Sequence, residues 1–95
     1  VGAGSAAVAR QVITGLGGAA NINSMDYCAT RLRVSIDDYT KVKESEIKRA
    51  GVAGVIRPSQ KSVQVVIGPQ VQFIYDAAAE ELKHSDTALH GEQEE

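Results

Sequence analysis

The chain has little of what marks several common classes of protein. It has one cysteine, two prolines and no tryptophan, and its aromatic side chains are three tyrosines and one phenylalanine. A single cysteine cannot form a disulfide within the chain, which is typical of a reducing compartment. No cluster of cysteine and histidine residues predicts a structural zinc site. No apolar run approaches the roughly 18 residues that a membrane-spanning helix needs.

The chain also lacks an excess of positive charge. Ten basic and twelve acidic side chains give a formal net charge of −2. Domains that bind nucleic acid usually carry a basic balance or a basic stripe, so nucleic acid is not an expected partner. A chain of 95 residues is long enough for one domain with a modest core.

What the chain does have is a cysteine followed closely by two arginines. Arg31 and Arg33 are the third and fifth residues after Cys28, in a stretch where polar and apolar residues alternate. This alternation is typical of a strand with one buried face, so both arginines should project from the same face. Guanidinium groups favour the thiolate form of a nearby cysteine and bind phosphoryl oxygens by charge-assisted hydrogen bonds. The combination indicates phosphoryl chemistry on cysteine.

A short link separates Cys28 from the strand that carries the arginines. Strand-like residues lie on both sides of this link, which predicts a hairpin with Cys28 near its turn. The backbone N–H groups of Ala29 and Thr30 are then candidates for a small anion-binding nest that holds a phosphoryl group. Nothing in the sequence calls for a metal ion or another cofactor.

Hydrophobic periodicity predicts the order helix, strand, strand, helix, strand, strand, helix. Two hairpins joined by helices indicate an α+β fold, with one mainly antiparallel four-stranded sheet and three helices on one face. Arg31 and Arg33 should point from the other face. The expected elements are helices 5–16, 43–50 and 69–83 and strands 22–27, 30–37, 53–57 and 62–67. Residues 1–4 are expected to be a linker or an added remnant, and the polar residues 84–95 a disordered tail.

Some other residues have plain structural interpretations. Asp38 is expected to be a turn or capping residue rather than a general acid. Phe73 and Tyr75, on the last helix, are expected to be packing residues. Arg57 and Lys61 are expected on a solvated surface, with a supporting role in phosphate binding as the alternative.

A set of separated positions forms a recognisable pattern around the cysteine: Asn21, Ile22, Cys28, Thr30, Arg31, Leu32, Val34, Ile36 and Asp38. This pattern resembles the signature of the enzyme IIB domain of the bacterial sugar phosphotransferase system, in its glucose, N-acetylglucosamine and glucoside class. Segments 17–18, 50–55 and 63–68 are also similar. The resemblance covers about residues 5–83, and the expected order of elements fits the fold of that family.

The resemblance implies a phosphotransferase that works as a relay. Cys28 would accept a phosphoryl group from the phosphohistidine of a IIA protein or domain. The group would then pass to a sugar that enters through a membrane IIC domain. Arg31 and Arg33 match the arginines that assist transfer to the sugar, and Thr30 matches a threonine that can hydrogen-bond the phosphate. The chain would then be a cytoplasmic domain attached to a sugar transporter in the cell membrane, with glucose, N-acetylglucosamine or an α-glucoside as the sugar.

Three other functions compete with this interpretation. A cysteine phosphatase needs an arginine six residues after its cysteine, and that position is Val34 here. A regulatory binding module would use the same cysteine surface as a phosphorylation sensor, with a transcriptional regulator as its partner and no transfer to sugar. A nucleic-acid-binding α+β domain is disfavoured by the acidic charge balance.

Overall fold

The computed structural model describes residues 2–90, with side chains from residue 4 to residue 83. The elements follow the predicted order, with two short 3₁₀ helices added as η1 and η2. They are α1 (Gly2–Gly15), η1 (Ala19–Asn21), β1 (Ile22–Tyr27), β2 (Arg31–Ile36), η2 (Tyr39–Lys41), α2 (Glu44–Lys48), β3 (Gly54–Ser59), β4 (Ser62–Val66) and α3 (Val71–His90).

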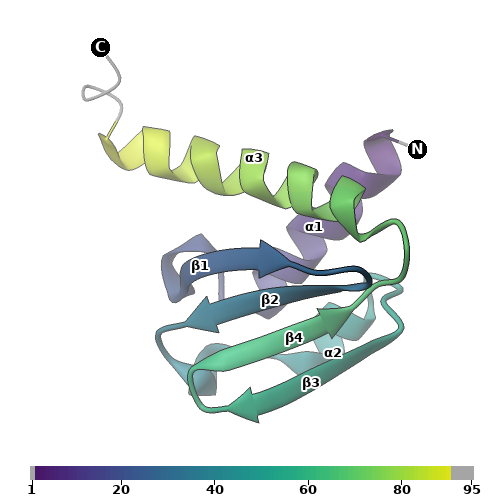
Figure 1. Cartoon of the computed structure of the whole chain (residues 1–95). Coiled ribbons are helices and arrows are strands. Elements are labelled where there is room, and N and C mark those ends of the chain that lie inside the picture. Colours follow the sequence, from purple (N-terminus) through teal and green to yellow (C-terminus); the bar gives the residue numbers. More distant parts are fainter. Residues whose placement is uncertain (1, 91–95) are drawn as a thin grey trace.

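The four strands form one antiparallel sheet in the order β1-β2-β4-β3. Both hairpins therefore meet at the centre, where β2 pairs with β4. Figure 1 shows α1 and α2 behind the sheet and α3 running across its upper side. The α+β class and the single antiparallel sheet are confirmed. None of the helices in the described part of the chain is long and apolar enough to cross a bilayer.

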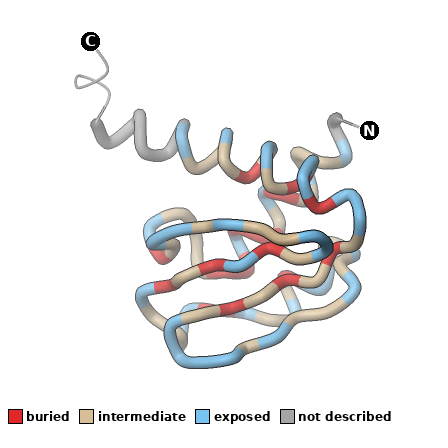
Figure 2. Tube along the Cα trace, viewed as in Figure 1, coloured by how far each residue is buried: buried red, intermediate tan, exposed pale blue. Residues whose placement is uncertain are grey.

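The core lies between the sheet and the helices. On β2, Leu32, Val34 and Ile36 are buried, while the residues between them are more exposed. On β4, Val63 and Val65 continue the same buried layer. The tube in Figure 2 shows these buried positions alternating along the central strands. Because strand side chains alternate between faces, this packing leaves Arg31 and Arg33 on the opposite face of the sheet, which we call the open face.

The main differences from the sequence-based expectation are at the helix ends. Helix α1 begins at Gly2 rather than at residue 5, and α3 continues to His90 rather than ending at residue 83. Residues 84–90, which were expected to belong to a disordered tail, continue α3 in this structure, whereas residues 91–95 lie outside the described residues. The polarity of this segment suggested disorder. It contains no glycine or proline before Gly91, however, so no strong helix breaker ends the helix earlier.

One buried amide ties the first helix to the first hairpin. Asn21 is only 3% exposed, and its Nδ2 donates to the carbonyl oxygens of Leu16 at 2.7 Å and Asp38 at 3.0 Å. Its Oδ1 accepts from the N–H of Asp38 at 2.7 Å. Asp38 in turn caps η2 by accepting from the N–H of Thr40, as expected of a capping residue. The Asn21 side chain thus holds the end of α1 against the far end of β2.

Replacing Asn21 with aspartate should destabilise the fold. A carboxylate cannot donate to the two carbonyl oxygens, and it places a charge where burial is nearly complete. We expect the free energy of unfolding to fall by about 2–4 kcal/mol, measured by urea denaturation. The matched control is Asn23→Asp, at an exposed position of β1, which should change stability by less than about 0.5 kcal/mol. Equal losses in the two variants would contradict the structural role of Asn21.

Candidate functional site at the β1–β2 turn

Cys28 lies at the turn that joins β1 to β2. Its N–H donates to the carbonyl oxygen of Arg31 at 2.9 Å, and the neighbouring pair in the ladder is Tyr27 with Leu32. Cys28 is therefore opposite Arg31, and residues directly opposite each other share a face of the sheet. The thiol is half-buried and belongs to the rim of the open face. This position leaves the sulfur accessible from outside the molecule.

Several groups converge on the sulfur atom. The backbone N–H of Thr30 is the strongest influence that lowers the pKa of the Cys28 thiol below its ordinary value of 9.0. The N–H of Arg31 and the charges of Arg33 and Arg31 lower the pKa further, whereas partial burial raises it. Hydrogen bonds and positive charge favour the thiolate, which is the nucleophilic form. The N–H of Thr30, one of the two groups expected in the nest, acts on the sulfur, and so does the N–H of Arg31.

The two arginines are held differently. The Nη1 of Arg31 donates to the Oε1 of Gln64 at 2.7 Å, and this bond links β2 to β4 across the open face. Arg33 is exposed and lies opposite Asp26 on one side and Gln64 on the other. One guanidinium group is therefore positioned in advance, while the other is free to reach toward a ligand.

Gln64 is a site residue that the sequence analysis missed. Valine-rich β4 alternates between buried and half-buried positions, and Gln64 is the polar residue between Val63 and Val65. A polar side chain between two buried apolar ones was the available signal. What the sequence alone did not indicate is that β4, rather than β3, lies beside β2.

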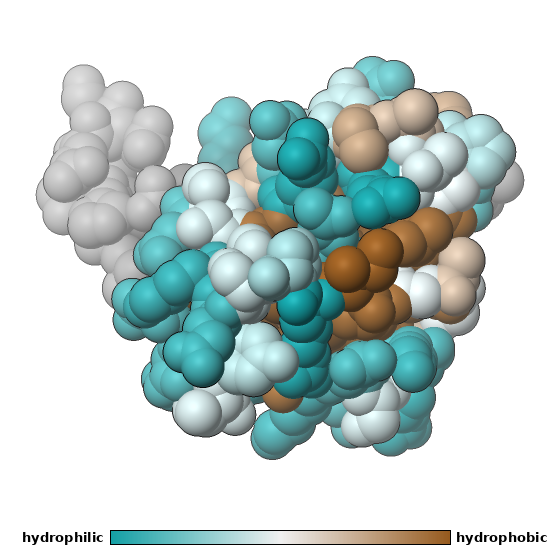
Figure 3. Space-filling model, turned by 60° about the horizontal axis from the view of Figure 1, so that its bottom comes forward, coloured by the Kyte–Doolittle hydropathy of each residue, from teal (hydrophilic) through white to brown (hydrophobic). Residues whose placement is uncertain are grey.

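An exposed apolar side chain lies on the same face of the sheet as these polar groups. Ile56 is 40% exposed and pairs with Gln64, so it lies in the same row of the open face as Arg33. Ile56 and Arg33 are two strand spacings apart, a distance of about 10 Å. Figure 3 shows hydrophobic side chains exposed among hydrophilic ones on one face of the molecule. A protein partner at the open face would thus meet apolar as well as charged surface.

Other residues singled out in the sequence lie elsewhere. Arg57 pairs with Glu44 at 3.4 Å and lies over the ring of Tyr39, while Lys61 donates to the carbonyl oxygen of Asp37. Neither is among the groups that act on the Cys28 thiol.

The two aromatic residues of α3 have different surroundings. Tyr75 packs against the ring of Tyr27, as expected of a packing residue. Phe73 is 61% exposed, so the expectation that it packs is wrong. It lies on the outer side of the first turns of α3, away from the core.

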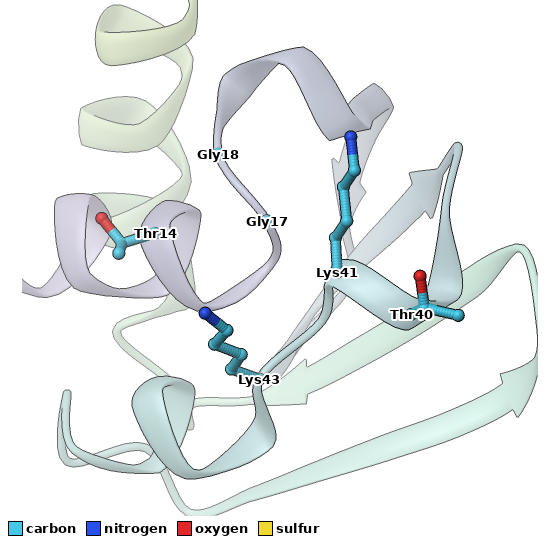
Figure 4. Close-up of a pocket in the computed structure, with 6 residues that line it drawn as sticks. All are labelled: Thr14, Gly17, Gly18, Thr40, Lys41 and Lys43. Carbon is cyan, nitrogen blue, oxygen red and sulfur yellow. The ribbon is translucent and has the colours of Figure 1, made fainter.

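A cavity of about 500 Å³ lies away from the cysteine. It is bordered by the loop after α1 and by η2, so it is near the beginning of β1 and the end of β2, whereas Cys28 is at their other ends. Figure 4 shows the residues that line it, which are Thr14, Gly17, Gly18, Thr40, Lys41 and Lys43. Within the described residues, no group of three or more histidine, cysteine, aspartate or glutamate side chains could hold a metal ion. Cys28 is not among the residues that line this cavity.

The pH dependence of Cys28 alkylation should reveal the lowered pKa. We expect the rate with iodoacetamide, followed by mass spectrometry from about pH 6 to pH 10, to have its midpoint at lower pH in the folded protein than in denaturant. In denaturant the midpoint should rise, because the N–H groups and arginines no longer surround the sulfur. The single cysteine makes the signal unambiguous. A folded-state midpoint at or above the midpoint in denaturant would contradict the described geometry.

Comparison with known proteins shows what this chain is similar to. Residues 10–42 match the family described as phosphotransferase system, EIIB. The N-acetylglucosamine-specific EIIB component of Streptomyces coelicolor is 41% identical over 63 residues, which cover 66% of this chain and 80% of that protein. A crystal structure of one domain of the PTS system IIabc component from Clostridium difficile aligns with a TM-score of 0.76 and 27% identity, covering 84% of each chain.

Longer relatives contain this chain as a part. The N-acetylglucosamine-specific EIICB component of Bacillus subtilis is 47% identical over 72 residues, and the maltose-specific EIICB component of Escherichia coli is 46% identical over 68 residues. These matches cover 76% and 72% of the chain but only 15% and 13% of the relatives. With the S. coelicolor protein matched over most of its length, the chain belongs to the EIIB family of the phosphotransferase system.

Proposed function

We propose that this chain is a phosphocysteine relay. It accepts a phosphoryl group on Cys28 from the phosphohistidine of a IIA protein or domain and passes that group to a sugar bound by a membrane IIC domain. The observation that carries this proposal is the convergence on one sulfur atom of two backbone N–H groups and two arginines. Relatives named EIICB and EIICBA support the two partners, because their names combine the three components.

The first step is attack by the Cys28 thiolate on phosphorus, in line with the P–N bond of the donor. The S–P bond forms as the P–N bond breaks, and an imidazole protonated on its other nitrogen leaves as a neutral ring. Such transfers are catalysed mainly by positioning and by stabilisation of charge on the phosphoryl oxygens. The N–H groups of Thr30 and Arg31 and the guanidinium groups are suited to this task, because all of them are donors.

The second step reverses the chemistry on sulfur. A sugar hydroxyl attacks phosphorus, its proton passes to a base of the sugar-binding partner, and Cys28 is released as a thiolate. Arg31, held by Gln64, keeps one set of donors fixed while the partners exchange. Arg33 is exposed and supplies the donors that can follow the phosphoryl group toward the acceptor. Both partners meet the same face of the domain in turn. Through its IIC partner, the domain acts as part of a membrane sugar transporter.

Phosphorylation of Cys28 is tested by intact-protein mass spectrometry. After incubation with a phosphorylated IIA protein, the wild-type chain should gain one phosphoryl group, and Cys28→Ser should gain none that is stable. A mass gain in both proteins would place the acceptor elsewhere. No gain with several IIA donors, alongside binding of a regulator, would favour the regulatory binding module without transfer to sugar.

The arginines are tested by conservative replacement. Arg31→Lys and Arg33→Lys keep the charge but lose the planar, bidentate donor geometry. We expect each to fold normally and to slow transfer from phosphocysteine to sugar by about 10²-fold in a reconstituted system. The control is Arg10→Lys, an exposed arginine of α1 paired with Glu81, which should leave the rate unchanged. Normal sugar phosphorylation by both site variants would show that the guanidinium pair is dispensable.

A further inference from the structure

The turn that carries Cys28 is fastened to the connection between β4 and α3. The carbonyl oxygen of Thr30 accepts two hydrogen bonds, from the N–H groups of Ile67 and Gly68, each at 2.8 Å. These donors come directly after the last residue of β4 and before the start of α3. In Figure 1 the β1–β2 turn lies beside the chain that rises from β4 to α3.

These two bonds determine where the next N–H points. The carbonyl of Thr30 and the N–H of Arg31 belong to the same peptide group, which is planar and trans, so they point in opposite directions. The carbonyl is held against Ile67 and Gly68, while the N–H on the other side faces the sulfur of Cys28. Donation into the carbonyl also polarises the peptide group and strengthens its N–H as a donor.

Gly68 can make its bond only in a conformation that suits glycine. Its φ is +122°, and a Cβ atom at this position would lie 2.9 Å from the Oε1 of Gln70. A residue with a side chain would be strained in this backbone region. Any relaxation of φ at residue 68 turns the peptide group whose N–H reaches Thr30.

A second contact fastens the other side of the turn. Tyr27 comes directly before Cys28, and its ring packs against that of Tyr75 on α3, with 4.6 Å between the ring centroids and 37° between the planes. Tyr27 points toward the helices, opposite to the open face, because it pairs with buried Leu32. The residues before and after the cysteine are thus attached to the start of α3 and the segment leading into it.

We propose that Gly68 is a positioning residue for Cys28. Through the Thr30 carbonyl it aims the Arg31 N–H at the sulfur and at the phosphoryl oxygens that the sulfur carries, and the Tyr27–Tyr75 contact supports the same alignment. The role in holding phosphoryl oxygens rests on the proposed function, whereas the role toward the thiol does not. The charged groups around the sulfur are Arg31 and Arg33, with Asp26 opposite Arg33, and all of them are retained in the variants below.

The test compares two glycines with similar backbone strain. Gly68→Ala should move the alkylation midpoint of Cys28 to higher pH and lower the rate at pH 7 by about threefold, because fewer thiols are ionised. The control is Gly51→Ala, since Gly51 also has a positive φ, of 88°, but a Cβ there meets nothing within 4 Å. It should lose stability without any change in the alkylation profile. An unchanged profile in folded Gly68→Ala would overturn the proposal.

A second pair of variants tests the same proposal if Gly68→Ala does not fold. Tyr75→Leu removes the ring contact but keeps an apolar side chain and a good helix former. It should raise the midpoint, whereas Phe73→Leu, at the exposed aromatic position of the same helix, should not. Identical profiles for Tyr75→Leu, Phe73→Leu and wild type would also overturn the proposal.

The thiol titration needs no phosphoryl donor, so the two proposals can fail separately. A shifted profile in Gly68→Ala, combined with no phosphorylation of wild type by any IIA donor, would support the positioning role and reject the relay. Phosphorylation of wild type, combined with an unchanged Gly68→Ala profile, would support the relay and reject the positioning role.

Discussion

Strand β2 pairs with β1 on one side and with β4 on the other, and most of the structure depends on this central position. One face of β2 places Leu32, Val34 and Ile36 in the core. The other face presents Arg31 and Arg33 beside the cysteine turn. Because the side-chain period of a strand is two, a shift of one residue in pairing would exchange these faces. Core packing and site geometry are therefore specified by the same register.

The site itself depends on backbone groups as much as on side chains. The N–H groups of Thr30 and Arg31 reach the sulfur only because the turn is tight, and the Thr30 carbonyl is anchored to the β4–α3 connection. Phosphoryl transfer needs donors that are already in place, since reorganisation adds to the barrier. In the proposed relay, a turn anchored in this way keeps the donors in place while two partners approach in succession.

The chain belongs to the EIIB family, and its fold agrees with a solved domain of the phosphotransferase system. The Tyr27–Tyr75 contact links the last helix to the turn that carries Cys28. The Arg31–Gln64 bond adds a link across the two central strands. Both contacts tie the surroundings of the sulfur to other elements of the fold.

The sequence by itself determined the kinds of elements, their order and the shared face of Arg31 and Arg33, because hydrophobic periodicity and local spacing are properties of neighbouring residues. Only the tertiary structure decided that Gln64 lies beside Arg31, that Phe73 faces outward and that the Thr30 carbonyl meets Ile67 and Gly68. These contacts join residues far apart in the chain. They depend on which strands become neighbours, and local patterns do not encode that choice.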